Sequence, residues 1–286
     1  MEHMTRGQLL GLGMTDRTIR ASVDAGTLVR LRAGHYADAA LVGLATRAVS
    51  AGGRLACVSE LRHRGVWVLD DGQLHVHVAR NASRLPVSAA RAHWRRLVAP
   101  AAADRAHVSP LDALVQAFGC LGHAAWLASV DSALHLGVIG IDELAKLREM
   151  IPAAYRWLVD AADRQAESGL ETIVRLIALQ LGFRVRPQVR VAGVGRVDLV
   201  VEGWVAVETD GTAFHDVAMS PGDRRRDARL AARGMTALRP GYSLVVFDRV
   251  TVARQLIGAV DAHRRVKDSG RLAVRARRRL AALDLS

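Results

Sequence analysis

Three carboxylates that are close together in the sequence are the residues of this chain best suited to chemistry. Glu208 and Asp210 lie in the run 204–211, and Asp198 precedes them in the run 195–201. Like charges held side by side require a cation, a shared proton or bulk water. Clustered oxygen ligands without cysteine suit Mg²⁺ or Mn²⁺, which can activate water and stabilise a phosphoryl transition state.

Both runs have the features of β-strands, because they are rich in valine and flanked by turn residues. Glu202-Gly203 supplies a hairpin turn between them. Since side chains alternate along a strand, Glu208 and Asp210 share one face, and the hairpin can bring Asp198 alongside them. The sequence therefore predicts three neighbouring carboxylates. The alternative is two short strands with acids at their solvent ends.

An amphipathic helix precedes these strands. It begins at Ser168-Gly-Leu-Glu171 and is closed by Gly182, so Glu171 lies in its first turn. His215 follows the strands, and a basic run 223–230 comes next, in which Arg226 and Asp227 favour an ion pair on a helix surface.

This order resembles the small endonuclease-like domains related to very-short-patch-repair endonuclease. The resemblance consists of a helix with Glu, a strand with Asp, a strand with Glu-x-Asp-Gly, a His and then Asp-x-x-Arg-Asp-x-x-Leu-x-x-x-Gly, over residues 168–260. Those domains have the restriction-endonuclease-like fold of the PD-(D/E)xK superfamily, so the resemblance implies a mixed sheet flanked by helices.

The resemblance also implies roles by position. Asp198 and Glu208 match the metal-binding acids, and Glu171 matches a helix carboxylate that adds a direct or water-mediated ligand. Asp210 stands where the superfamily has Lys, so it becomes a candidate third metal ligand, and the usual cation near the attacking water is missing. His215 matches the histidine of the repair-endonuclease branch and could act as general base or phosphate donor. The alternative for His215 is a solvated loop histidine.

Charge favours a polyanionic partner. Among 286 residues, 40 are Lys or Arg and 28 are Asp or Glu, which gives a formal net charge of +12 and a pI near 11.1. This excess makes nucleic acid the leading partner. Lys146 and Lys267 are the only lysines. A GC-rich coding bias would explain that imbalance, but arginine also suits bidentate phosphate contact, so counting does not separate the two causes.

The cysteines and paired histidines carry weaker signals. Cys57 and Cys120 are far apart and lack CxxC spacing, so the sequence predicts neither a zinc site nor a disulfide framework. His75 and His77 share one face of a predicted strand, 74–78, where a metal pair is possible. With no third ligand in register, we expect these histidines to face solvent.

The first forty residues predict a winged helix-turn-helix. Two short helices, the second capped by Thr15, precede a tight hairpin. On this fold Arg17 and Arg20 would enter a DNA groove, and Arg30 and Arg32 on the wing would contact phosphates.

The runs 14–20 and 28–37 resemble the N-terminal domain of AbiEi-type antitoxins, which bind DNA and repress their own operon. The resemblance implies DNA and a toxin-like protein as partners. A winged helix can also serve as a protein docking module. The N-terminus lacks the apolar core of a signal peptide, and no apolar run reaches transmembrane length, so we expect a cytoplasmic protein without a membrane partner.

The sequence therefore predicts an α/β protein with four parts. These are a winged helix-turn-helix at 1–40, a mixed α/β middle domain at 41–152, an endonuclease-like domain at 160–263 and a basic helical tail at 264–286. The expected function is Mg²⁺-dependent or Mn²⁺-dependent hydrolysis of DNA phosphodiesters. The alternative is a non-cutting, antitoxin-like repressor, which the missing Lys favours, whereas the presence of all four acids favours the enzyme. Oligomeric state is left open.

Overall fold

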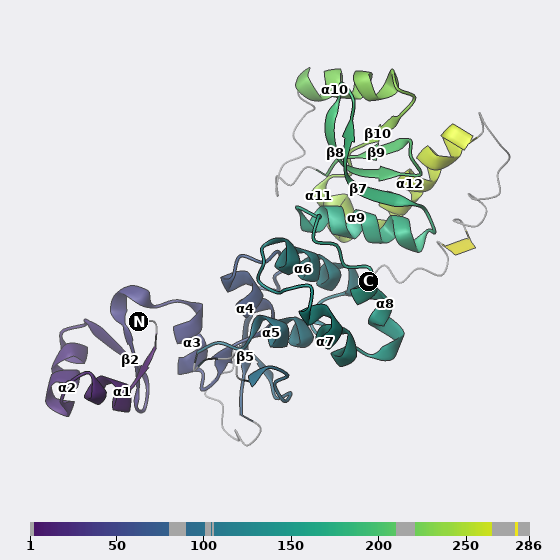
Figure 1. Cartoon of the computed structure of the whole chain (residues 1–286). Helices are drawn as coiled ribbons and strands as arrows, with labels where there is room; N and C mark the ends of the chain where they lie inside the picture. The colour runs from purple at the N-terminus through teal and green to yellow at the C-terminus, as the bar shows by residue number, and fades with distance from the viewer. Residues whose placement is uncertain are drawn as a thin grey trace. The chain divides into compact units, whose positions relative to one another are not determined.

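The computed structural model describes residues 3–79, 90–100, 104, 106–209, 221–264 and 278–279 (Figure 1). Helices and strands alternate along the chain, which confirms the predicted α/β class. The chain divides into two compact units. The N-terminal unit comprises Met1–Leu121 and Val138–Arg156, and the C-terminal unit comprises Gly122–Gly137 and Trp157–Ser286.

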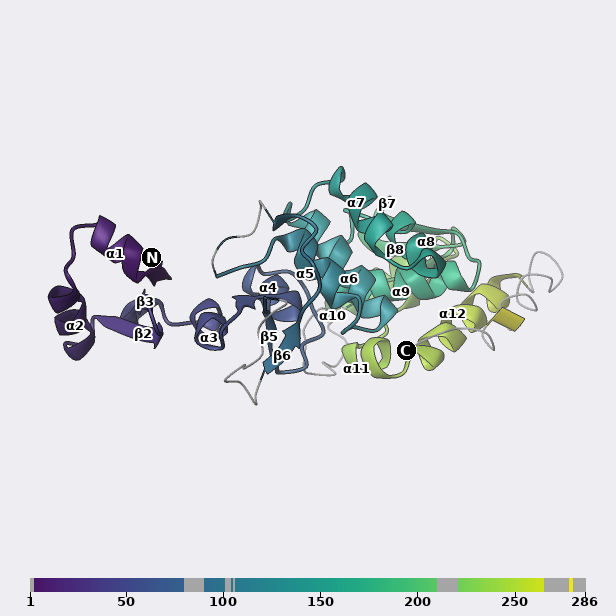
Figure 2. The same ribbon diagram turned by 90° about the horizontal axis from the view of Figure 1, so that it is seen from below.

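The N-terminal unit begins with two helices and a three-stranded sheet of order β1-β3-β2 (Figure 2). The elements are β1 (Met4–Thr5), α1 (Arg6–Gly11), α2 (Asp16–Asp24), β2 (Leu28–Arg32) and β3 (His35–Asp38). The Thr15 side chain accepts a hydrogen bond from the amide of Thr18 and so caps α2. Met4, Leu9 and Ile19 form a small buried core. The predicted order of two helices and a hairpin is confirmed.

A second sheet lies in the same unit, with order β4-β5-β6. Strand β5 pairs antiparallel with β4 and parallel with β6. Helix α4 packs against both β5 and α5. The further elements of this unit are the short helix η1 (Ala39–Leu41), α3 (Leu44–Ser50), β4 (Arg54–Leu55), α4 (Cys57–His63), β5 (Leu74–His77), β6 (Ala90–His93), α5 (Pro110–Ala117), α7 (Glu143–Met150) and η3 (Ala153–Tyr155).

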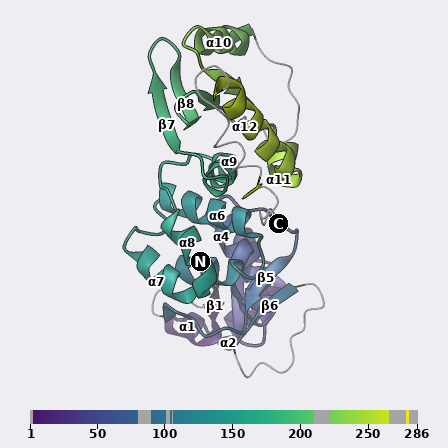
Figure 3. The ribbon, with the colours of Figure 1, turned by 90° about the vertical axis from the view of Figure 1, so that its right-hand side faces the viewer.

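The C-terminal unit is built on a four-stranded mixed sheet of order β10-β9-β8-β7 (Figure 1), and its β7 and β8 are seen from another side in Figure 3. Strands β7, β8 and β9 form an antiparallel meander, and β10 pairs parallel with β9. The elements are α6 (His123–His135), α9 (Gly169–Gln180), β7 (Val185–Val191), β8 (Gly195–Val201), β9 (Val205–Val207), α10 (Pro221–Ala231), β10 (Thr236–Leu238), α11 (Tyr242–Phe247) and α12 (Arg249–Arg264). Helix α8 (Arg156–Asp160) begins at the boundary of this unit.

Helices cover this sheet. Leu230 of α10 packs in one buried cluster with Val200 and Ala206 of the central strands. Helix α9 contacts β7 and β8, and α12 contacts β9. The turn between β8 and β9 has positive φ at both Glu202 (54°) and Gly203 (90°), and Val201 pairs with Val205, so the hairpin loop consists of Glu202, Gly203 and Trp204. The predicted hairpin is confirmed.

The division of the chain differs from the expected middle domain of residues 41–152, because α6 belongs to the C-terminal unit. Asp131 on α6 is fully buried and pairs with Arg175 on α9 at 2.6 Å. It also accepts hydrogen bonds from the Thr172 hydroxyl and the Asp163 amide, both at 2.8 Å. Burial outweighs the charge of Arg175 and raises the pKa of Asp131. A partner 44 positions away leaves no local signal in the sequence.

The chain between Asp131 and Leu147 is not one continuous helix, because it is interrupted between α6 and α7. Helix α6 ends before Gly137, which adopts a positive φ of 67°. The predicted tail, 264–286, lies almost wholly outside the described residues. Among the residues that the structure does describe, no helix is both long and apolar enough to cross a bilayer.

We predict that Asp131→Ala lowers the free energy of unfolding by about 3–5 kcal/mol, because it leaves Arg175 buried without its counter-ion. Glu167→Ala is the matched control. Its exposed ion pair with Arg196, at 2.6 Å, should contribute less than about 1 kcal/mol. Urea unfolding of both variants measures the difference. Equal losses in the two variants would show that the buried pair does not hold α6 to α9.

Candidate active site

Strand register places Asp198 opposite Glu208. Strands β8 and β9 pair antiparallel with Leu199 opposite Val207, so the next position along brings the two acids together. The backbone amide of Thr209 donates to Oδ2 of Asp198 at 2.9 Å, which ties the ends of the two strands. This register agrees with the predicted juxtaposition of these two residues, and their roles as metal ligands stay predictions.

Glu171 lies in the first turn of α9, as predicted. The Ser168 hydroxyl accepts from the amide of Glu171 at 3.2 Å and caps the helix. The Glu171 carboxylate accepts from Gln188 of β7 at 2.8 Å and from the Glu167 amide at 3.2 Å. Burial, and then the negative charge of Asp198, raise the pKa of Glu171. The two carboxylates thus belong to one electrostatic group.

Glu208 has cationic partners from two elements. Its carboxylate pairs with Arg226 of α10 and with Arg239, which directly follows β10. Arg239 also pairs with Asp227 at 3.0 Å, and Arg226 donates to the carbonyl of Arg196. The expected surface pair between Arg226 and Asp227 is therefore wrong, because each side chain turns to a different partner. The charge of Glu208 is neutralised within the protein.

The remaining predicted ligands are not placed. Asp210 and His215 lie outside the described residues, so their roles stay predictions. Among the described residues, the ligand atoms of Glu171, Asp198 and Glu208 do not form a close group of three that could hold a metal ion as they stand. Asp198 is thus related to Glu208 by strand register and to Glu171 by electrostatic repulsion.

The four arginines predicted to contact DNA are all exposed. Arg17 and Arg20 lie on α2, and Arg30 and Arg32 lie on β2. Arg6 is not counted with these four arginines, because its Nε donates to Asp16 at 2.7 Å. This bond connects α1 to α2.

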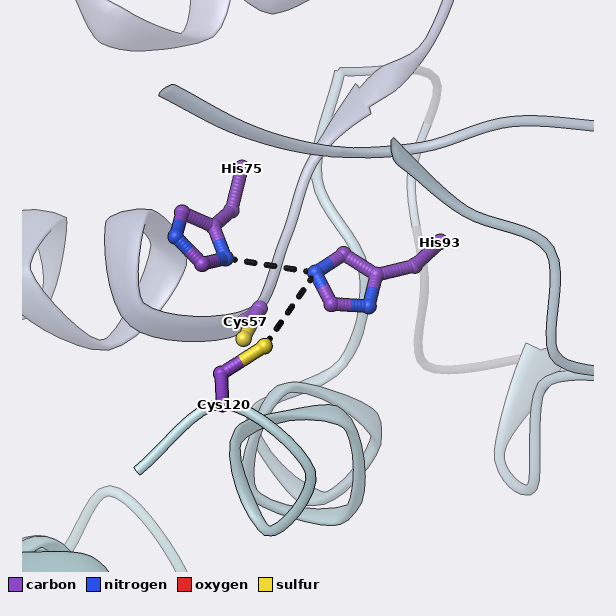
Figure 4. A group of neighbouring side chains, drawn as sticks. All are labelled: Cys57, His75, His93 and Cys120. Atoms are coloured by element: carbon purple, nitrogen blue, oxygen red, sulfur yellow. Dashed lines mark hydrogen bonds between the residues drawn. The ribbon is translucent and has the colours of Figure 1, made fainter. Parts of the chain in front are cut away.

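A second group of chemically capable side chains was missed by the sequence analysis. Donor atoms of Cys57, His75, His93 and Cys120 all lie within 4.8 Å of one another (Figure 4). Cys57 begins α4, the two histidines lie on the paired strands β5 and β6, and Cys120 follows α5. His75 is fully buried, so the expectation that it faces solvent is wrong.

Spacing explains the miss. His93 follows His75 by 18 positions and precedes Cys120 by 27, far outside the short intervals by which ligand motifs are recognised. His77, in contrast, is half-buried and contacts the side-chain amide of Gln116 at 3.3 Å. The available signal was that both cysteines and five histidines of the chain fall between residues 57 and 120.

The two cysteine thiols shift each other's pKa in opposite directions. Burial, and then the hydrogen bond to Cys120, raise the pKa of the Cys57 thiol. The same hydrogen bond lowers the pKa of Cys120 to about 3, and His75 and His93 lower it further. Of the two thiols, Cys120 therefore has the lower pKa, because its half-exposed sulfur lies beside two imidazoles.

Comparisons with known proteins do not assign this chain to a family. No family model, curated protein or solved structure matches the chain. Function therefore has to be inferred from the chain's own residues and their arrangement.

We predict that Glu171→Gln raises the melting temperature at neutral pH when divalent cations are chelated. The folded state binds the Glu171 proton more tightly than the unfolded chain does, because burial and Asp198 raise its pKa. The cost of ionising Glu171 is therefore present above the folded pKa and disappears below the ordinary value of 4.5.

Thermal melting in EDTA between about pH 4 and about pH 8 measures this effect. The gain of the variant should be largest at the high end and vanish at the low end. Glu167→Gln, which removes an exposed carboxylate from the same segment, should give no such trend. A gain that does not depend on pH would contradict the electrostatic explanation.

Proposed function

We propose that this chain is a DNA-binding protein whose C-terminal unit hydrolyses DNA phosphodiesters with the help of Mg²⁺ or Mn²⁺. The observation that carries the proposal is the placement of Asp198 opposite Glu208, with the buried carboxylate of Glu171 in the field of Asp198. These are the three acids that the endonuclease resemblance assigns to metal binding and that fall in the described residues. Their oxygen-only donor set suits a hard divalent cation.

The architecture agrees with the same proposal. The C-terminal unit has a mixed sheet with helices packed on it, and the chain order is helix α9, strands β7 to β9, helix α10 and strand β10. A mixed sheet flanked by helices is what the resemblance implies. Fold alone does not assign an activity, so the argument depends on the site.

The acids fit a cation on electrostatic grounds. The raised pKa of Glu171 means that its negative charge is unfavourable where it lies, beside Asp198. A divalent cation held by Asp198, Glu208 and Glu171 would offset that charge. When bound, such a cation lowers the pKa of a coordinated water and stabilises charge on a phosphoryl group.

Arg226 and Arg239 complete the proposed site. Both guanidinium groups contact Glu208 in the structure. A DNA phosphate, like a carboxylate, offers two oxygens that can accept a bidentate pair of hydrogen bonds from a guanidinium group, so it can draw one arginine away from Glu208. That exchange would neutralise the phosphate and free Glu208 to bind the cation.

We predict that the full chain cuts or nicks plasmid or mismatched duplex DNA with Mg²⁺ or Mn²⁺ and is inactive in EDTA. Asp198→Asn and Glu208→Gln should each lower the rate by on the order of 100-fold or more, because each removes a ligand that stabilises transition-state charge. Glu167→Gln, an exposed acid of the same unit, should keep full activity. Gel assays of all four proteins, purified identically, measure this.

Two outcomes would count against the enzyme. Equal activity of Asp198→Asn and the wild type would indicate a contaminating nuclease. No cleavage of duplex, mismatched or single-stranded DNA with either cation would leave the second candidate, a non-cutting regulator. The neutralisation of Glu208 by Arg226 and Arg239 favours that candidate, because Glu208 then needs no metal to balance its own charge.

DNA binding is common to both candidates, and it rests on the exposed arginines of α2 and β2. We predict that each of Arg17→Ala and Arg30→Ala reduces the slope of log K against log salt by about 1 if the side chain contacts a phosphate. On a winged helix, Arg30→Ala should weaken all sequences alike, and Arg17→Ala should change sequence preference.

Fluorescence anisotropy at salt concentrations between about 50 and about 200 mM measures both effects. Arg47→Ala, an exposed arginine on α3 outside the helix-turn-helix, is the control and should leave the slope unchanged. Affinity that does not change across this salt range would rule out phosphate-dependent binding.

A further inference from the structure

The Cys and His side chains of the N-terminal unit converge on one point. Nδ1 of His75 and Nε2 of His93 are 3.2 Å apart, and the Cys120 sulfur is 4.0 Å from the same nitrogen of His93. Figure 4 shows both cysteines and both rings directed towards one another from four different segments. We propose that Cys57, His75, His93 and Cys120 bind a single Zn²⁺.

The distances agree with a tetrahedral site. Zinc bonds to histidine nitrogen at about 2.0–2.1 Å and to cysteine sulfur at about 2.3 Å. At tetrahedral angles, two nitrogens are then about 3.3 Å apart, and a nitrogen and a sulfur are about 3.6 Å apart. The observed separations of 3.2 and 4.0 Å differ from these by a few tenths of an ångström. The side chains thus need little movement to close around a cation.

The surroundings orient the ligands as metal sites require. Nε2 of His75 contacts both carboxylate oxygens of Asp71, at 3.1 and 3.2 Å. When that nitrogen carries the proton and donates to Asp71, Nδ1 presents its lone pair to the centre. On the other side, the amide of Cys57 donates to the buried Gln116 side chain at 3.1 Å. Cys57 itself has a positive φ of 51°, so this bond holds it in an uncommon conformation.

Ligand chemistry selects zinc. Two thiolates and two imidazoles are soft to borderline donors that suit Zn²⁺ and disfavour Mg²⁺. Four protein ligands fill a tetrahedral shell, so the site is structural and leaves no open position for water. The ion would cross-link α4, β5, β6 and the turn after α5. The site therefore differs in metal, unit and role from the carboxylates of the proposed nuclease.

A disulfide between Cys57 and Cys120 explains less of the arrangement. It would use both sulfurs but would leave the imidazole nitrogens of His75 and His93 facing each other without a cation. It would also give no reason for the carboxylate of Asp71 to orient the His75 ring. His93 lines a cavity together with Trp94 and Phe118, which provides a path for a metal ion to enter.

The test uses the full chain, purified without a histidine tag in reducing buffer, and measures metal content by mass spectrometry. The wild type should hold one zinc per chain. Replacing it with Co²⁺ should give the intense visible bands of tetrahedral cobalt and a sulfur-to-cobalt charge-transfer band. Cys120→Ser and His93→Gln should lose the metal, and Cys120→Ser should weaken the charge-transfer band. Chelation should lower the melting temperature of the wild type.

Two further variants keep the test decisive if a ligand variant does not fold. Asp71→Asn retains all four ligands and should lower zinc affinity about 10–100-fold. His63→Ala removes an exposed histidine from α4, the helix that carries Cys57, and should bind zinc like the wild type. The proposal is overturned if the wild type binds neither zinc nor cobalt, or if bound Co²⁺ shows no thiolate charge transfer. It is also overturned if Asp71→Asn binds zinc as tightly as the wild type. Formation of a Cys57–Cys120 disulfide by the reduced protein in the presence of zinc would overturn it as well.

Discussion

The register of the β8–β9 hairpin is the constraint on which the proposed active site depends. Positive φ at Glu202 and Gly203 closes a tight turn over residues 202–204, and the pairing of Val201 with Val205 across this turn sets Leu199 opposite Val207. A slip of one residue would turn each side chain of β9 to the other face and separate Glu208 from Asp198. Parallel pairing of β10 with β9 then places Arg239 beside Glu208, since Leu238 lies opposite Val207. This turn thus positions Asp198 on β8, Glu208 at the end of β9 and Arg239 at the end of β10.

Buried charge is handled in two different ways in the C-terminal unit. Asp131 and Glu208 each have arginine partners, so their burial leaves a balanced pair or group. Glu171 is also buried, but its carboxylate accepts hydrogen bonds from the Gln188 side chain and the Glu167 backbone amide, and the negative charge of Asp198 raises its pKa. Uncompensated charge of this kind is unfavourable for folding, so it marks a position where a ligand can be stabilising. The contrast among the three acids points to the Glu171–Asp198 side of the group as the place for a cation.

Short-range features of the fold were predictable, and long-range partners were not. Thr15, Ser109 and Ser168 each cap the helix that follows, as their spacing from it indicates, because capping involves only the next three residues. The Glu202-Gly203 turn is equally local. The pairing of Arg226 with Glu208, the attachment of α6 through Asp131 and the meeting of Cys57 with Cys120 all depend on how separate elements pack. Periodicity in the sequence records which face is buried but not which residue lies across from it.

Two sites of opposite chemical character can exist in one chain because ligand type separates the metals. Divalent zinc binds most N, O and S sites more tightly than magnesium or manganese, so affinity alone would send zinc to both. The Cys and His group offers sulfur and imidazole in a closed shell, where magnesium gains little. The carboxylates offer oxygen only, and Glu208 already pairs with two arginines. These ion pairs would weaken the binding of a cation unless a phosphate first draws an arginine away. Competition from Arg226 and Arg239 would therefore make metal binding at the acids depend on DNA, whereas zinc binding at the cysteines would not.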